Sequence, residues 1–81
     1  MKERQLKERG NMQINGYSIE RGANLYGVNL RGADLTGANL RHANLTDVDL
    51  RHADLTYATY NDATIWPVGY VPDFSKMRKS S

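Results

Sequence analysis

A leucine occupies every fifth position from Leu25 to Leu55, and an alanine or valine stands two residues before each one. The run reads GANLY GVNLR GADLT GANLR HANLT DVDLR HADLT over residues 22–56 and continues more weakly through YATYN and DATIW to Trp66. A period of five matches neither the 3.6 residues of an α-helical turn nor the alternation of a β-strand. The repeat covers more than half of the 81 residues, so it decides the fold of this chain.

Each five-residue unit, such as 38–42 (ANLRH), has two apolar positions separated by one polar residue. If alanine and leucine face inward, three residues form a short extended stretch. The other two turn a corner, where Gly, Asn, Asp, Thr and His are typical. Stacked coils can bury leucines that a single unit cannot, so we expect a narrow solenoid with a leucine core. A helix is excluded, because leucines spaced by five would point all round its axis.

The motif A-(N/D)-L-x-x closely resembles the pentapeptide repeat family over residues 22–66. This resemblance implies an all-β fold, a right-handed quadrilateral parallel β-helix with four units in a coil and about two to three coils. The closing TIWPVGY also resembles the ending of pentapeptide proteins of cyanobacteria. The central inward position carries over onto Leu25, Leu30, Leu35, Leu40, Leu45, Leu50, Leu55, Tyr60 and Ile65. The preceding inward position carries over onto Ala23, Val28, Ala33, Ala38, Ala43, Val48, Ala53, Ala58 and Ala63.

The chain divides into three segments: residues 1–21, a lead-in and cap; 22–66, the repeat; and 67–81, a C-terminal cap with a basic tail. Residues 2–9 have charges spaced for a short helix, but so few residues favour a frayed or weakly docked segment, with a capping helix or arm on the repeat end as the alternative.

The apolar residues of the lead-in are spaced as inward-facing residues would be: Met12, Ile14, Tyr17 and Ile19. We expect Ile14 and Ile19 to cover the N-terminal end of the core. At the other end, Pro67 and Gly69 end the coil, and a mobile basic tail is expected from Lys76 onward.

Composition excludes several classes of function. The chain has no cysteine and no long apolar run, so we expect no disulfide, no membrane insertion and a cytoplasmic location. No phosphate-binding loop, zinc motif or catalytic triad is present, and a solid leucine core leaves no substrate cavity. With four units in a coil, His42 and His52 lie on opposite faces and cannot share an ion, although His42 lies above Asp62. We therefore expect neither an enzyme nor a cofactor or metal.

Two surfaces are candidates for binding a partner. Four units in a coil place Arg31 and Arg51 on one face, where Asp49 can balance their charge. This face is either an ordinary charge-balanced surface or a site for an anion or partner. The aromatic group of Tyr57, Tyr60, Trp66, Tyr70 and Phe74 either caps the last coil or forms an interface. The tentative protein-binding residues are Tyr57, Trp66, Tyr70, Phe74, Arg31 and Arg51.

These observations predict a non-enzymatic protein-binding or structural module, a small rigid solenoid that docks onto or scaffolds a larger assembly, host- or phage-encoded. Its partner is another protein or complex, and an open solenoid end could also pair two copies into a homodimer. The alternative, suggested by the family resemblance, is a DNA-mimicking inhibitor of an enzyme such as DNA gyrase. A mimic needs a strongly negative rod, whereas residues 22–66 carry three arginines against five aspartates. The few basic tail residues do not predict nucleic-acid binding.

Overall fold

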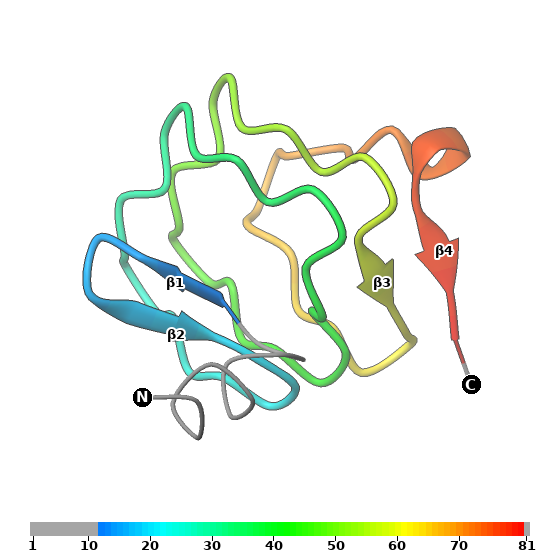
Figure 1. The fold of residues 1–81 in the computed structure, drawn as a ribbon, viewed down its shortest axis with the longest axis horizontal. Helices are drawn as coiled ribbons and strands as arrows, with labels where there is room; N and C mark the ends of the chain where they lie inside the picture. The colour runs from blue at the N-terminus through cyan, green and yellow to red at the C-terminus, as the bar shows by residue number, and fades with distance from the viewer. Residues whose placement is uncertain (1–11, 81) are drawn as a thin grey trace, which may run out of the picture.

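The structure is a computed structural model, and it describes residues 12–80 of the chain. Residues 2–9, for which a short helix and a frayed segment were the alternatives, lie outside the described range. The elements are β1 (Met12–Ile14), β2 (Tyr17–Ile19), β3 (Thr59–Tyr60), the 3₁₀ helix η1 (Phe74–Lys76) and β4 (Arg78–Lys79). In Figure 1, the β1–β2 hairpin lies at one end of a stack of loops, and β3, η1 and β4 lie at the other.

The corner of each pentapeptide is a hydrogen-bonded turn. The backbone N–H of the alanine or valine donates to the carbonyl of the preceding leucine, as from Val28 to Leu25 at 3.0 Å. In the turns of residues 22–57, the third residue has a positive φ, a conformation that glycine adopts without steric cost. Glycine fills this position only in the first half of the repeat, and side-chain-bearing residues fill it later. In chain order these residues are Gly22, Gly27, Gly32, Gly37, His42, Asp47, His52 and Tyr57.

The polar residue before each leucine stabilises the same corner. The Asn24 Oδ1 accepts a hydrogen bond from the Tyr26 backbone N–H at 3.2 Å, and Asp34 does the same for Thr36 at 3.1 Å. This Asx geometry needs a short side chain with an acceptor oxygen, which is what asparagine and aspartate have in common. The alternation of Asn and Asp at this position therefore follows from the turn, whichever charge it leaves on the surface.

The chain stacks on itself with an offset of twenty residues. Isolated parallel bridges join Asn24 to Asn44, Asn29 to Asp49, Asp34 to Asp54, and Asn39 to Thr59. At the first of these, the Leu25 N–H donates to the Asn44 carbonyl at 2.9 Å. Four successive units thus hydrogen-bond to the next four, which is the pairing of a β-helix-like solenoid.

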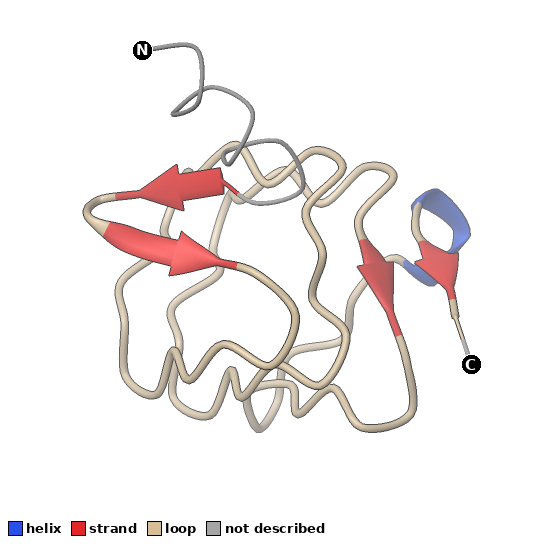
Figure 2. Cartoon of the chain, turned by 60° about the horizontal axis from the view of Figure 1, so that its bottom comes forward, coloured by secondary structure: helices blue, strands red, loops and turns tan. Residues whose placement is uncertain are grey.

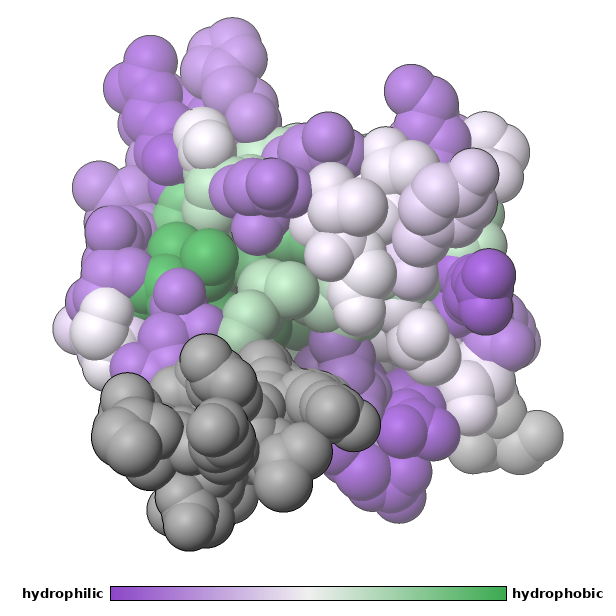
Figure 3. Space-filling view, in the orientation of Figure 1, coloured by the Kyte–Doolittle hydropathy of each residue, from purple (hydrophilic) through white to green (hydrophobic). Residues whose placement is uncertain are grey.

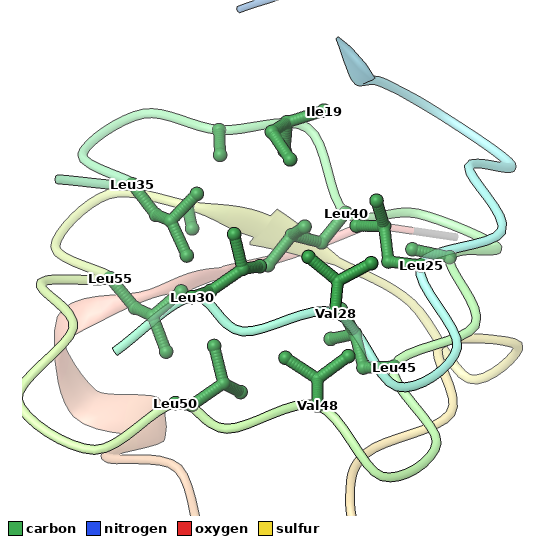
Figure 4. Packing of buried hydrophobic residues seen from close by; sticks show 13 residues of the cluster. Ile19, Leu25, Val28, Leu30, Leu35, Leu40, Leu45, Val48, Leu50 and Leu55 are labelled. Atoms are coloured by element: carbon green, nitrogen blue, oxygen red, sulfur yellow. The ribbon is translucent and has the colours of Figure 1, made fainter. Parts of the chain in front are cut away.

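The core runs along the inside of this stack (Figure 4). All seven leucines from Leu25 to Leu55 are buried, and Leu30, Leu35, Leu40 and Leu45 have no exposed surface. Val28, Ala38, Ala43, Val48 and Ala58 are also buried, whereas Ala23, Ala33 and Ala53 are partly buried against the core. The inward positions predicted from Ala23 to Leu55 are therefore confirmed.

The predicted inward positions are wrong in the last unit. Ile65 is 52% exposed and Ala63 is exposed, whereas Thr64 is buried and Trp66 is half-buried. The bridge on this face joins Asn44 to Ile65, an offset of twenty-one residues instead of twenty. The turn before Thr64 thus contains one residue more than the repeat predicts, and Thr64, Ile65 and Trp66 change sides as a result.

Buried polar side chains hold this extra residue. The Asn61 Oδ1 accepts hydrogen bonds from the backbone N–H groups of His42 and Ala63, both at 3.1 Å. The Thr64 hydroxyl donates to the Leu40 carbonyl at 2.8 Å. Because Asn61 is 5% exposed, it is not the outward residue that the repeat implies, and it replaces Asp62 as the partner of His42.

A hairpin covers the N-terminal end of the core. β1 pairs antiparallel with β2, with Ile14 opposite Tyr17, and Asn15 and Gly16 form its turn with φ values of 53° and 84°. Ile19 is fully buried and Ile14 packs on the core, as predicted. Tyr17, however, is 47% exposed, although it lies on the same side of β2 as the buried Ile19. The Asn-Gly pair was the available sequence signal for this hairpin.

The basic residues near the C-terminus form a strand instead of a loose tail. β4 pairs parallel with β3, with Thr59 opposite Arg78 (Figure 2). The Arg78 N–H donates to the Ala58 carbonyl at 2.8 Å, and the Ser80 N–H donates to the Tyr60 carbonyl at 2.7 Å. The ladder of the solenoid therefore continues through this segment, because its backbone groups match those of the coil beneath.

Candidate protein-binding surface

The arginine face contains a close ion pair. Arg51 donates to Asp49 through Nε at 3.0 Å and through Nη2 at 2.7 Å, so the pair is bidentate. These hydrogen bonds, with the Arg51 backbone N–H and the charge of Arg31, hold the pKa of the Asp49 carboxyl far below its usual value. The Arg51 side chain is still 67% exposed, so the pair adds little to stability. Arg31 is also exposed, and the ion pairs found within residues 12–80 do not include it, so it is the freer of the two cations for a partner's carboxylate.

Four of the five predicted aromatic residues form one cap. The Tyr60 ring centroid lies 4.9 Å from that of Phe74 and 6.1 Å from that of Trp66, and Trp66 stacks on Tyr70 at 6.2 Å. Burial raises the pKa of the Tyr70 hydroxyl. Tyr60 is larger than the leucines it follows in the repeat, and the cap provides the space that it needs. Tyr57 lies apart from the cap, with the Arg78 guanidinium 5.8 Å from its ring centroid.

The six tentative binding residues therefore do not meet on one surface. Arg31 and Arg51 each lie two residues after one member of the Asn29–Asp49 bridge. Trp66, Tyr70 and Phe74 lie in the cap. The structure adds apolar side chains that the repeat could not place: Ile65, Val68 and Val71 are 52%, 98% and 84% exposed. Figure 3 shows one face of the molecule, with hydrophobic residues visible between hydrophilic ones.

Two hollows lie beside the segment that leads into β4. A hollow of about 150 Å³ is lined by Ala53, Asp54, Leu55, Thr56, Tyr70, Asp73 and Lys76. A more open groove of about 480 Å³ is lined by Thr56, Tyr57, Ser75, Lys76, Met77 and Arg78.

The two carboxylates of the smaller hollow already have partners. Hydrogen bonds from Thr56 chiefly lower the pKa of Asp54, and bonds from Ser75 chiefly lower that of Asp73; the charge of Lys76 lowers both further. Within residues 12–80 there is no group of three or more His, Asp or Glu side chains that could hold a metal ion. No helix in the same range is long and apolar enough to cross a membrane.

The sequence model of pentapeptide repeats matches residues 21–59 with eight copies. The chain belongs to the pentapeptide repeat family. The crystal structure of a pentapeptide repeat protein from Nostoc Pcc 7120 is similar, with 31% sequence identity and a TM-score of 0.60. The match covers 75% of this pentapeptide repeat protein and 59% of the Nostoc chain. A comparison with curated protein sequences found no match.

Proposed function

We propose that this pentapeptide repeat protein is a non-enzymatic module that docks onto, or scaffolds, a larger protein assembly in the cytoplasm. The observation that carries the proposal is the ladder of backbone hydrogen bonds between coils, which holds outward side chains at fixed positions. A surface ordered before binding loses less conformational entropy when a partner docks. The two hollows beside β4 are open to solvent, which suits contact with a protein surface better than enclosure of a small substrate.

The finer architecture belongs to the same proposal. We take the solenoid to be a right-handed, four-sided β-helix of about two to three coils, capped by residues 1–21 and 67–81. Support comes from the four parallel bridges with an offset of twenty residues, which join one coil to the next. Such a frame offers a partner two kinds of surface, its flat faces and its ends. The Arg31–Arg51 face and the cap with Trp66, Tyr70 and Phe74 are the proposed contact regions.

DNA mimicry receives no support from the distribution of charge. Residues 12–80 carry seven basic and seven acidic side chains, and two of the aspartates, Asp49 and Asp62, form ion pairs with Arg51 and Lys79. A mimic of the DNA backbone needs a dense row of unpaired negative charges. A supercoiling assay separates the two functions: we expect no inhibition of DNA gyrase at micromolar protein, and inhibition would favour mimicry.

The experiment for docking is capture of a partner by the full chain, cross-linked in lysate of the native host and identified by mass spectrometry. Binding is then measured between the two purified proteins. We expect saturable binding at a defined ratio, weakened by the double variant Arg31→Gln/Arg51→Gln or by Phe74→Ala, with Thr36→Ala as an exposed control. Absence of any stoichiometric partner would reject the proposal. Light scattering after size exclusion tests the end-to-end homodimer separately.

A further inference from the structure

Tyr57 occupies a corner where a side chain costs stability. Its φ is +64°, in the left-handed region that disfavours a large residue by about 1–2 kcal/mol. The equivalent corner one coil earlier is Gly37, whose N–H donates to the Thr56 carbonyl. Tyr57 is 61% exposed and takes no part in the aromatic cap, so burial offsets little of the strain. Strain of this kind, held by the surrounding ladder, often marks a residue used for binding.

Arg78 completes the surface beside Tyr57. Its guanidinium lies over the Tyr57 ring. The ion pairs found within residues 12–80 join Arg51 to Asp49 and Lys79 to Asp62, and neither of them involves Arg78. The backbone of β4 fixes the position of Arg78 through the bond to Ala58. Arg78 is therefore an ordered cation whose side chain is available to a carboxylate.

The groove between these residues has a composition that selects its ligand. The groove is lined by two cations, Lys76 and Arg78, and by the apolar surfaces of Tyr57 and Met77. None of its lining residues is acidic. The lysine is already attracted to Asp54 and Asp73, which leaves the arginine as the main anchor for a carboxylate. Arginine and tyrosine are also the residues that most often dominate protein interfaces.

We propose that the groove lined by Tyr57, Met77 and Arg78 binds a short acidic segment of a partner protein. One glutamate or aspartate of the segment pairs with the Arg78 guanidinium, and a neighbouring apolar side chain lies on Tyr57 and Met77. The proposal deepens the docking function and rests on it, since it names the chemistry of the partner at one site.

Fluorescence anisotropy with a fluorescein-labelled peptide of four glutamates around one leucine tests this directly. We expect a Kd on the order of 100 µM, as suits a small interface, that weakens as salt is raised. The Arg78→Gln variant should lose about tenfold in affinity, because it loses a charge-assisted hydrogen bond. Lys79→Gln removes a neighbouring charge already paired with Asp62 at 3.0 Å, and should change affinity by less than about twofold.

Tyr57→Gly gives the sharpest result, because binding and stability should move in opposite directions. Affinity should fall about fivefold as the apolar contact is lost, while the melting temperature should stay level or rise, since glycine relieves the strain. Tyr26→Ala, at an equally exposed tyrosine, should leave affinity unchanged. A lower melting temperature for Tyr57→Gly would show a structural role and overturn the proposal.

Further outcomes would also overturn the proposal. One is that a peptide with glutamine in place of each glutamate binds as tightly as the acidic peptide. Another is that Arg78→Gln and Lys79→Gln lose the same affinity for the acidic peptide. A third is that a single-stranded oligonucleotide of matched charge binds more tightly than the peptide. The peptide assay uses purified protein, so its failure leaves the docking function standing if lysate capture succeeds. A captured partner that binds wild type and Tyr57→Gly equally would locate docking elsewhere on the molecule.

Discussion

Paired alanine substitutions at Leu45 and Ile65 test the register change near the end of the repeat. Both residues occupy the central position of their pentapeptide, so the repeat alone predicts equal burial. In the structure Leu45 has no exposed surface, whereas Ile65 is 52% exposed on the opposite side of the ladder. The two substitutions should therefore have very different effects on stability.

The magnitudes follow from burial. Removing a fully buried leucine side chain costs about 3–5 kcal/mol, the sum of lost transfer energy and the cavity left behind. Ile65→Ala removes a side chain that is half in water already, and should cost less than about 1 kcal/mol. In a domain of this size, 1 kcal/mol corresponds to about 4–8 °C in melting temperature. Leu45→Ala should thus lower it by more than about 12 °C.

Urea unfolding provides the measurement. Trp66 is the only tryptophan and is half-buried in the cap, so its fluorescence reports on the C-terminal end, and circular dichroism reports on the whole ladder. Equal slopes against urea would show that both variants unfold from the same compact state. A loss of stability in Ile65→Ala as large as in Leu45→Ala would place Ile65 in the core and refute the register change.

Thr64→Val should cost about 1–3 kcal/mol in chemical unfolding, because it removes the buried hydroxyl that bonds the Leu40 carbonyl and the Asn61 N–H; an unchanged midpoint would contradict that role. His52→Gly should stabilise the fold by about 0.5–1 kcal/mol in the same assay, since His52 has a φ of 65°, and a loss of stability would show that its side chain is needed. Acid should destabilise the protein slightly: the pKa of Asp49 is lowered in the folded state, so its small stabilisation is complete above about pH 4 and is lost as pH falls further. Asp49→Asn should make stability fall less steeply with acid in melts between about pH 5 and pH 2, and an unchanged slope would exclude this pair as a source.

The repeat predicted the part of the fold that depends on local geometry. Each pentapeptide makes its corner with its own atoms, as when the Asn24 side chain bonds the Tyr26 N–H. Inward and outward positions could therefore be assigned from Leu25 to Leu55 with no knowledge of the neighbouring coil. The candidate surface was predictable only in part: Asp49 was placed correctly beside Arg51, but the aromatic group separated into a cap and an isolated Tyr57.

The remaining errors arise where distant segments decide the conformation. The extra residue before Thr64 is favoured by bonds to His42 and Leu40, which lie about twenty residues earlier and have no local sign. β4 likewise forms because its backbone groups meet those of β3, although its residues look like a polar tail. The apolar Ile65 faces water for the same reason, since its orientation follows from the chain before it.

The sequence by itself determined the pentapeptide corner, the leucine core and membership of the pentapeptide repeat family, because turn chemistry and side-chain periodicity act within a few residues. The tertiary structure alone decided the register at Asn61, the pairing of the C-terminal strand and the meeting of Tyr57 with Arg78. Each of these depends on hydrogen bonds between coils, and such bonds can form only after the chain has returned on itself.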